Sequence, residues 1–406
     1  MSAARVLAPQ TWMTAAATRR LVAALGAGGT EIRFVGGCVR DALIGRASSD
    51  IDVATPDPPD VVTRKLRAAG LRAIPTGIEH GTVTALVDDR SYEITTLRRD
   101  VATDGRHAEV AFTDDWREDA ARRDFTMNAL SATPDGALHD YFGGLADLEA
   151  GRVVFVGEPA RRIAEDYLRV LRFYRFHARY GRGAPDAPAR AACRAAAASG
   201  ALARLSGERV RTELLKLLAA HDPVPATRAM VEDGVLAALL PMAGDEGVLA
   251  ALVPLEPAGA GEPLRRLASL LPAATSRTAI ETAIERLRLS GRQGARLLLM
   301  AGAQALDRTS LRRALHADGA EAVRDRVLLA VARGAAREAL APALAAVAEW
   351  TAPAFPLSGA DVLALGVVPG PRVGALLETV EDWWIAQDFA PGRDACLREL
   401  SRQHAA

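Results

Sequence analysis

The pattern of apolar residues changes near residue 155, and this change limits the folds that the chain can adopt. Between residues 30 and 140, short runs that alternate apolar and polar residues, typical of strands, lie between helical segments. Beyond about residue 155 the strand pattern disappears, and amphipathic segments rich in Ala, Leu and Arg continue to the C-terminus. We therefore predict an α+β protein, with a small α/β head built on a mixed sheet and an all-helical remainder.

The expected elements of the first half follow from strand alternation and from Pro, Gly and cap signals. They are a leading helix within residues 1–30, strands at 31–37 and 50–55, helices at 38–45 and 56–70, a β-hairpin at 81–100 with its turn at Asp88–Ser91, and a long helix at 158–181.

Composition excludes several classes of protein. Lys+Arg and Asp+Glu both number 50, so any basic surface must be local, and the only lysines are Lys65 and Lys216. Cys38, Cys193 and Cys396 form no CxxC pair, which indicates neither a disulfide framework nor a zinc site. We find no apolar run of ~18 residues and no signal-peptide pattern, so we predict a cytoplasmic protein without a membrane partner. No protein partner is evident from the sequence.

Two carboxylates share one face of a predicted strand. In "SDIDVAT" (49–55), Asp50 and Asp52 alternate with the apolar Ile51 and Val53, so both carboxylates point the same way. Like charges side by side repel unless a cation lies between them, and Mg²⁺ prefers such hard oxygen ligands together with water and substrate phosphates. A solvated strand edge is the structural alternative for this pair.

A glycine turn precedes the carboxylates. In "FVGGCVRD", Gly36 and Gly37 lie between a predicted strand and a predicted helix, where the backbone can approach a phosphate closely. Arg40 could grip the same phosphate with two hydrogen bonds. Asp41 is open to another interpretation, as a buried partner or a local cap.

Further charged residues extend the candidate site. Glu93 in "YEITTLRR" would provide a third carboxylate if its hairpin neighbours strand 50–55, although it could also be an exposed hairpin charge. In "ARRDFTMNAL" (121–130), Arg122 and Arg123 could hold phosphate or ribose. A salt bridge with Asp124 at the start of an apolar helix is the alternative.

The predicted helix at 158–181 carries a basic stripe. Asp166 and Arg169 are three residues apart, so on one helix they would be neighbours on one face. Arg169, Arg172 and Arg175 continue at steps of three. No acidic residue follows Asp166 before Asp186, which favours a functional stripe over a solvated face.

The combined motifs resemble the class II tRNA nucleotidyltransferases, that is, the bacterial-type CCA-adding enzymes and their poly(A) polymerase relatives. The resemblance covers roughly residues 30–180 and is general beyond about residue 230. The motifs that carry it, in order, are "FVGGCVRDALIGRASSDIDVAT", "PTGIEHGTVTALV", "YEITTLRRD", "RRDFTMNAL" and "EDYLRVLRFYRF".

The resemblance implies a reaction and a division of the chain. The tRNA 3′-hydroxyl would attack the α-phosphate of CTP or ATP and release pyrophosphate, with Asp50 and Asp52 holding Mg²⁺ and Glu93 supporting them. The implied parts are an N-terminal helix (1–30), a nucleotidyltransferase head (31–150), a helical neck with the nucleotide-selecting helix (151–225), and a tRNA-binding helical body and tail (226–406).

The resemblance also implies roles in nucleotide binding. Gly37 and Arg40 would bind the triphosphate, and Arg123 would touch the nucleotide or its sugar. Asp166 and Arg169 would read the incoming base. The complete implied nucleotide-binding set is Gly36, Gly37, Arg40, Arg123, Asp166, Arg169, Arg172 and Arg175.

Two features select among activities in such a family. Poly(A) polymerases carry a "GRRF"-like segment, and "AIPTGIEHGTVTALV" here is similar to the CCA-adding form. Enzymes that add only CC lack a flexible loop before "RRDFT", and the segment Arg98–Phe112 looks full length. We therefore expect CCA addition, with poly(A) synthesis or partial addition (CC only or A only) as the alternative. At the His-Asp pair His221-Asp222 we expect a helix end rather than a phosphohydrolase site, since no spaced set of His and Asp residues surrounds it.

Two other classes of protein remain as rivals. A DxD motif also marks glycosyltransferases that bind sugar nucleotides through a metal, but that interpretation leaves "EDYLR" and the helical remainder unexplained. Activity on UDP-sugars without use of CTP would favour it. A non-catalytic RNA-binding module is the second rival, and the presence of Asp50, Asp52 and Glu93 argues against it.

Overall fold

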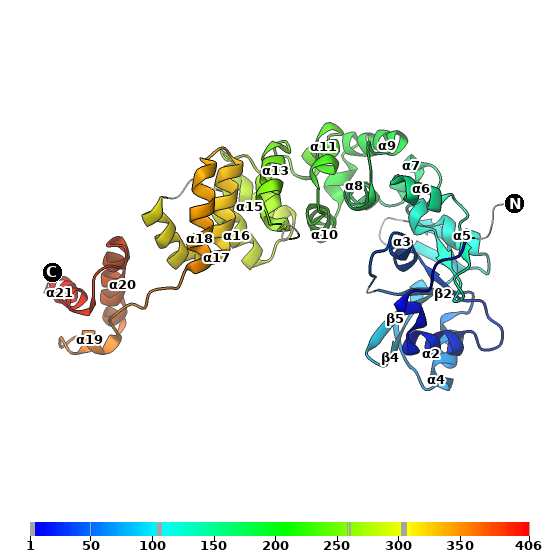
Figure 1. The fold of residues 1–406 in the computed structure, drawn as a ribbon, viewed down its shortest axis with the longest axis horizontal. Helices are drawn as coiled ribbons and strands as arrows, with labels where there is room; N and C mark the ends of the chain where they lie inside the picture. The colour runs from blue at the N-terminus through cyan, green and yellow to red at the C-terminus, as the bar shows by residue number, and fades with distance from the viewer. Residues whose placement is uncertain are drawn as a thin grey trace. The chain divides into compact units, whose positions relative to one another are not determined.

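The computed structural model describes residues 5–48, 50–103, 108–257, 259, 261–301 and 307–405. The chain forms two compact units, one of residues 1–243 with 286–288, the other of residues 244–285 with 289–406. We describe each unit by itself (Figure 1). Within the described part of the chain, no helix has both the length and the apolar character needed to cross a bilayer.

The first unit contains a seven-stranded mixed sheet of order β3-β4-β5-β2-β1-β8-β9. Strand β2 pairs in parallel with β5, and the other neighbours are antiparallel. This confirms the predicted mixed sheet. The strands are β1 (Arg33–Val35), β2 (Asp52–Thr55), β3 (Arg72–Gly77), β4 (Thr82–Val87), β5 (Arg90–Thr96), β8 (Ser131–Ala132) and β9 (Leu138–His139).

Short helices surround the sheet. Helices α2 and α4 pack against each other and against β4 (Figure 1). The predicted leading helix is in fact two helices, because Ala15 between them has an extended ψ of 142°. The helices of this part are α1 (Thr11–Thr14), α2 (Ala16–Leu25), α3 (Gly37–Leu43), α4 (Pro59–Ala68), α5 (Trp116–Ala121) and α6 (Gly144–Ala150).

Several other expectations about this part were wrong in detail. Strands β3, β8 and β9 were not predicted. The hairpin turn is shorter than expected, because Val87 pairs with Arg90 and β5 begins there. The apolar helix expected within residues 121–130 is only a 3₁₀ turn at Thr126–Asn128, which leads into β8.

The segment expected to be an irregular loop before "RRDFT" forms two paired strands. Strands β6 (Arg98–Thr103) and β7 (Ala108–Phe112) make a separate antiparallel pair. Residues 104–107, between the two strands, lie outside the described residues. The described residues of this segment, β6 and β7, therefore form the two strands of a β-hairpin.

The long helix predicted at 158–181 is two helices. Helix α7 (Pro159–Glu165) ends before Asp166, which has extended backbone angles of φ −156° and ψ 107°. Helix α8 (Leu168–Tyr180) then begins after Tyr167. Asp166 therefore lies in a break between two helices, and the prediction that it shares a helix face with Arg169 was wrong.

Helix α8 is the central helix of the helical part of the first unit. It packs against α10 and α11, and its apolar side, including Leu171 and Phe173, is fully buried. His221 and Asp222 lie between α10 and α11, and the Asp222 carboxylate accepts a hydrogen bond from the Val224 amide. The remaining helices here are α9 (Ala187–Ala198), α10 (Gly207–Leu218), α11 (Val224–Glu232) and α12 (Val235–Leu239).

The second unit is helical throughout its described residues. Its long helix α17 is interrupted at Gly319, where φ is +82°. The helices are α13 (Gly247–Leu252), α14 (Pro263–Ser269), α15 (Arg277–Arg286, whose last residue belongs to the first unit), α16 (Gly291–Ala301), α17 (Arg308–Ala332), α18 (Leu340–Glu349), α19 (Gly359–Leu363), α20 (Pro371–Ala386) and α21 (Arg393–Ala405).

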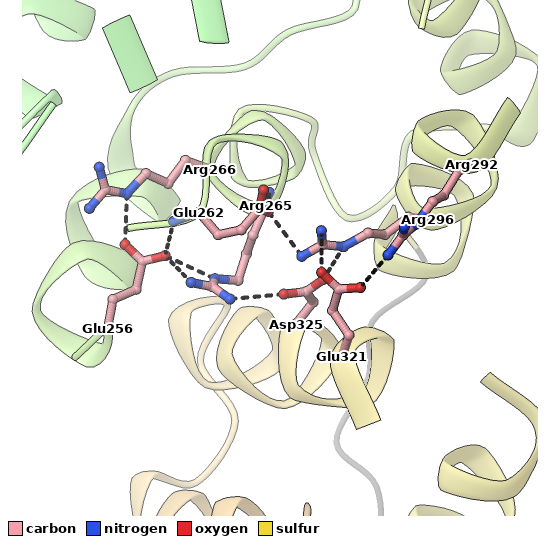
Figure 2. Close-up of polar contacts among 8 residues, drawn as sticks. All are labelled: Glu256, Glu262, Arg265, Arg266, Arg292, Arg296, Glu321 and Asp325. Atoms are coloured by element: carbon pink, nitrogen blue, oxygen red, sulfur yellow. Dashed lines mark hydrogen bonds and ion pairs between the residues drawn. The ribbon is translucent and has the colours of Figure 1, made fainter. Parts of the chain in front are cut away.

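A buried network of ion pairs joins α14, α16 and α17 in this unit (Figure 2). The Asp325 carboxylate accepts hydrogen bonds from Arg265 at 2.8 Å and from Arg296 at 2.7 Å. Glu256 accepts from Arg265 at 2.5 Å and from Arg266 at 2.7 Å. The Glu256 and Asp325 side chains are each 1% exposed. Because every buried charge shown has an opposite partner, the network is compatible with the apolar core around it.

Candidate active site

Asp52 and Glu93 lie opposite each other on neighbouring parallel strands. The register of β2 and β5 pairs Asp52 with Glu93 and Val53 with Ile94. Paired residues of adjacent strands present their side chains on the same face of a sheet, so the two carboxylates are neighbours. The expectation that the Glu93 hairpin neighbours the Asp52 strand is confirmed.

Asp50 belongs to the same face. Ile51 and Val53 are buried, whereas Asp50 is exposed and Asp52 is half-buried. This is the predicted alternation, although β2 itself begins only at Asp52. Three carboxylates thus occupy one edge of the head, two of them from one stretch of chain and the third from the next strand.

The crowding of acids around Asp52 has an electrostatic consequence. Burial, followed by the negative charges of Glu93 and Asp50, raises the pKa of Asp52 to about 6, while Arg123 acts in the opposite direction. Within the described ranges, no three His, Cys, Asp or Glu side chains converge closely enough to form a metal site alone. An open pair of hard oxygen donors fits a divalent cation that takes its remaining ligands from water and phosphate, as Mg²⁺ does.

Only glycine suits position 36, because of its backbone conformation and because of the side chain that lies next to it. Its φ is +67°, a region that other residues rarely adopt, and a Cβ there would lie 2.8 Å from Nη1 of Arg123. The Arg123 guanidinium is also within 3.4 Å of the Asp119 carboxylate and of the Asn128 carbonyl oxygen. Glycine at this position therefore lets the guanidinium lie directly over the turn between β1 and α3.

A cavity of about 450 Å³ brings the head residues together with Asp166 and with residues of α8 and α10. It contains seven of the eight nucleotide-binding residues implied by the sequence. Asp50, Asp52 and Glu93 are not among its lining residues. The lining consists of Gly36, Gly37, Arg40, Arg123, Asp124, Asn128, Asp166, Leu168, Arg169, Arg172, Phe176 and Arg209.

Arg40 is fixed from several sides. Its guanidinium donates to the Asp41 carboxylate at 2.9 Å and to the Asn128 side-chain oxygen at 2.5 Å, and it lies 4.3 Å from the centre of the Tyr180 ring. Asp41 also accepts a hydrogen bond from the Tyr180 hydroxyl. Asp41 is therefore a buried hydrogen-bond partner of Arg40 and Tyr180, in agreement with the alternative interpretation of this residue.

Asp166 and Arg169 both line the cavity but form ion pairs with other residues. The Asp166 carboxylate accepts from Arg209 of α10 at 2.6 Å. Arg169 donates to Glu165 at 2.5 Å and to the Arg162 carbonyl oxygen at 2.8 Å. Arg209 thus orients the Asp166 side chain, and Glu165 orients the Arg169 side chain.

Arg172 joins α8 to the head through Asp124. The guanidinium donates twice to this carboxylate, at 2.8 and 2.5 Å, and Asp124 also accepts from the Asn128 side chain. Burial alone would lower the pKa of Arg172, but Asp124 and Glu213 raise it above its ordinary value. The acidic partners of the stripe come from other elements of the chain, so the absence of acids along the helix itself did not reveal them.

Arg175 lies outside the nucleotide cavity. It donates to Glu213 at 2.6 Å and lines a second, neighbouring cavity. The alternative interpretation of Arg122 and Arg123, a salt bridge with Asp124, was wrong: both pair with Asp119. Asp124 is left to bind Arg172.

Sequence reasoning did not assign three polar residues that line the cavity: Asp124, Asn128 and Arg209. The first two lie within the motif "RRDFTMNAL", so the motif itself was a signal for them. Arg209 is 43 residues from Asp166 in sequence, and no local pattern marks it.

The sheet, the carboxylate edge and the arginine-lined cavity together define a nucleotidyl-transferring head followed by helices. Residues 32–154 match the model of the Poly A polymerase head domain, and residues 186–245 match that of the probable RNA and SrmB-binding site of polymerase A. The chain is 34% identical over 384 residues to the mitochondrial CCA tRNA nucleotidyltransferase 1 of Danio rerio, covering 92% of this chain and 87% of the relative.

Two further comparisons agree. A CCA-adding enzyme of Lacticaseibacillus paracasei is 31% identical over 384 residues, which is 89% of each chain. The crystal structure of Bacillus stearothermophilus CCA-adding enzyme in complex with CTP superposes with a TM-score of 0.74 at 26% identity, covering 95% of this chain and 96% of that one. The chain belongs to the class II tRNA nucleotidyltransferases, the family of the CCA-adding enzymes.

Proposed function

We propose that this chain adds CCA to the 3′ end of tRNA without a nucleic-acid template, using CTP and ATP and releasing pyrophosphate. The observation that carries the proposal is the register of Asp52 against Glu93, beside a cavity lined by arginines from both the head and α8. The relatives that match nearly the whole chain are named for this activity. The partners of the reaction are therefore tRNA, CTP and ATP.

Enzymes of this family work with a divalent metal, and we propose Mg²⁺ here. Asp50 and Asp52 would hold it, with Glu93 as a third carboxylate on the same face. When bound, the metal neutralises charge on the phosphates and lowers the barrier to attack by the 3′-hydroxyl. The carboxylates would contribute by fixing the cation at the edge of the sheet, because without it they would repel the phosphates of the nucleotide.

The cavity residues bind and orient the nucleotide. Arg40 and Arg123 face the turn at Gly36 and Gly37, where the backbone is open to the triphosphate. Arg172 of α8, held by Asp124, lines the same cavity. Charge-assisted hydrogen bonds from three guanidinium groups suit an anion that carries several negative charges.

We assign base selection to Asp166 and Arg169. Cytosine and adenine share an exocyclic amino donor beside a ring nitrogen acceptor, and a carboxylate and a guanidinium are complementary to these two groups. Uracil and guanine place a carbonyl oxygen where the amino group would be, which would face the Asp166 carboxylate as acceptor against acceptor. The assignment rests on both side chains lining one cavity.

Poly(A) synthesis and partial addition remain the alternative activities within the family. The hairpin of β6 and β7 is present before the "RRDFT" motif, which supports complete CCA addition over CC addition alone. The cytoplasmic location predicted from the sequence stays a prediction, since the Danio rerio relative is described as mitochondrial.

One assay tests the proposed function. Purified protein is incubated with Mg²⁺, a tRNA that ends before CCA, and labelled CTP, ATP or both, and products are resolved at single-nucleotide length. We expect two C residues and then one A. A ladder of A residues with ATP alone would identify a poly(A) polymerase, and absence of incorporation with every nucleotide would refute the proposal.

A further inference from the structure

Arg162 is a buried cation beside the nucleotide cavity. It lies on α7, its side chain is 9% exposed, and it is not among the residues that line the cavity. A buried guanidinium is tolerated only where its donors find acceptors. The acceptors of Arg162 include backbone groups of the head and a carboxylate on its own helix, and these two sets lead to different parts of the site.

The first set of contacts is with the backbone that carries Arg123. Nη2 of Arg162 donates to the carbonyl oxygen of Arg122 and, at 2.8 Å, to that of Arg123. The segment between α5 and the 3₁₀ turn at Thr126–Asn128 is thereby fastened to α7. This segment holds the Arg123 side chain, which lines the nucleotide cavity and lies over the turn at Gly36.

The second set of contacts is with the side chain of Arg169. Nη1 of Arg162 donates to the Glu165 carboxylate at 2.5 Å, and the same carboxylate oxygen accepts from Nη1 of Arg169 at 2.5 Å. Arg169 also donates to the Arg162 carbonyl oxygen at 2.8 Å. The Arg169 guanidinium is therefore held by the backbone of Arg162 and by a carboxylate that Arg162 also binds.

These contacts form a continuous path from Arg123 to Arg169. The path leads from the Arg123 carbonyl oxygen through the Arg162 guanidinium and the Glu165 carboxylate to the Arg169 guanidinium. Neither Arg162 nor Glu165 lines the cavity, whereas both ends of the path do. A site that holds one part of a nucleotide with one side chain and its base with another must keep these two side chains at a set separation.

We propose that Arg162 is a positioning residue that sets the placement of Arg169 relative to Arg123. The two arginines that line the cavity then act together on one nucleotide, Arg169 on its base and Arg123 on its sugar or phosphates. The inference rests on the proposed function, because it concerns how the site of nucleotidyl transfer is assembled. Arg162 itself acts through its neighbours and touches no substrate.

The planar guanidinium is the chemical reason for an arginine at this position. Its two terminal nitrogens point in fixed directions, so one reaches the carbonyl oxygens of residues 122 and 123 while the other reaches Glu165. A lysine would keep the positive charge but would present one nitrogen in place of two. It would satisfy one set of acceptors and release the other.

The test measures base selection in Arg162→Lys and Arg162→Gln. The matched control is Arg161→Gln, since Arg161 is the neighbouring residue on α7, has a side chain that is 81% exposed and pairs with the same Glu165 at 3.8 Å. Selection is the ratio of kcat/KM for CTP to that for UTP on a tRNA that ends before CCA. Both values come from one preparation, so the ratio does not depend on the fraction of protein that is folded.

We expect both Arg162 variants to lose about tenfold or more of this selection, because a small displacement of a positioned group is costly, and Arg161→Gln to retain it. In an Arg169→Gln background, Arg162→Gln is expected to cause no further loss of selection, because it acts through Arg169. The ratio of Kd for UTP to Kd for CTP, measured by calorimetry without tRNA, is expected to fall in the same variants.

Two results would overturn the inference. The first is selection in Arg162→Lys and Arg162→Gln that equals that of Arg161→Gln. The second is a loss that multiplies with the loss caused by Arg169→Gln, which would show that Arg162 acts by a route that does not include Arg169. Failure of the proposed function would appear separately, as wild-type protein that binds CTP in preference to UTP but incorporates neither, and the binding ratio would still test Arg162.

Discussion

The Asp166 carboxylate pairs with Arg209 at 2.6 Å, and not with Arg169 three residues further along the chain. An intrahelical salt bridge between Asp166 and Arg169 is thereby excluded as the role of this pair in the structure. The two side chains lie in one cavity with separate partners, Arg209 for the first and Glu165 for the second. Their orientation is thus set before a base arrives, which is what a protein template requires.

Replacing Asp166 is expected to weaken base discrimination. If Asp166 reads the base as proposed, Asp166→Ala removes the acceptor for the amino group of C and A, and also the acceptor that would repel the carbonyl oxygen of U and G. A site of paired polar groups rejects a wrong partner by as much as about 10⁴-fold, so a large loss of discrimination against UTP and GTP is expected. Single-nucleotide incorporation with all four NTPs measures it.

The control for this experiment is Asp60→Ala, which removes an exposed carboxylate on α4. If Asp166→Ala rejects UTP and GTP as sharply as this control does, Asp166 does not read the base. Reduced rates with CTP and ATP at unchanged discrimination would indicate a purely structural role beside Arg209.

Asp50→Ala or Asp52→Ala is expected to abolish addition of both C and A. The two nucleotides would use the same carboxylate edge, so loss of either oxygen donor removes both activities together. Binding of tRNA is expected to persist in an anisotropy measurement, because the helical remainder of the chain would supply most of the contacts. Wild-type rates in either variant at ordinary Mg²⁺ concentration would contradict the metal assignment.

Shortening the hairpin of β6 and β7 is expected to leave products that end in CC. The variant joins Arg98 to Phe112 through a two-residue turn, so it removes most of both strands. The base of the hairpin is retained, because Arg98 and Phe112 are paired in the native register. Product length on sequencing gels measures the outcome, and completion of CCA at the normal rate would show that the hairpin has another task.

The buried network of the second unit is expected to be a large contributor to its stability. Asp325→Ala would leave Arg265 and Arg296 without their shared carboxylate in a site where Asp325 is 1% exposed. Breaking a buried pair in this way costs about 3–5 kcal/mol. Urea denaturation measures the loss.

The matched control is Glu281→Ala, which removes an exposed i, i+4 pair with Arg277. Such surface pairs contribute about 0.3–0.5 kcal/mol. A loss for Asp325→Ala no larger than that for Glu281→Ala would mean that the surrounding core compensates for the missing carboxylate.

The contribution of His177 to the stability of the first unit is expected to fall as the pH decreases below about 6.5. Burial, and then the positive charge of Arg190, lower the pKa of His177 in the folded chain. Below its ordinary pKa of about 6.5 the unfolded chain binds the proton more readily, so the equilibrium shifts toward unfolding. The free energy of unfolding of wild type and His177→Gln between pH 5 and 8 measures this, and the variant is expected to show the weaker pH dependence. Identical slopes would exclude His177 as the source.

The parts of the site that sequence predicts well are those set by local geometry. The alternation of Asp50 and Asp52 with Ile51 and Val53 depends only on the pleat of a strand, and it appears as expected. Placing Glu93 beside Asp52 needed one further assumption, namely that the hairpin containing Glu93 lies next to the strand containing Asp52. The parallel register of β2 and β5 confirms it.

The parts that sequence did not predict are set by partners far along the chain. The break at Asp166 has no Pro or Gly to mark it, and the carboxylate there is instead held by Arg209 from α10. Arg172 likewise finds its acidic partner 48 residues away in Asp124. Short edge strands such as β9 were missed for a related reason, since two residues carry no periodicity and depend on their neighbours for pairing.

The break between α7 and α8 has a consequence for a site that takes nucleotides of two sizes. Asp166 lies in extended backbone between the helices, whereas Arg169 is anchored within α8. Because Arg209 of α10 holds the Asp166 carboxylate and Glu165 holds Arg169, the spacing of the pair is set by two separate ion pairs and not by the pitch of one helix. The same two groups would then face a single-ring pyrimidine and a two-ring purine alike, and the difference in ring size would be accommodated elsewhere in the cavity.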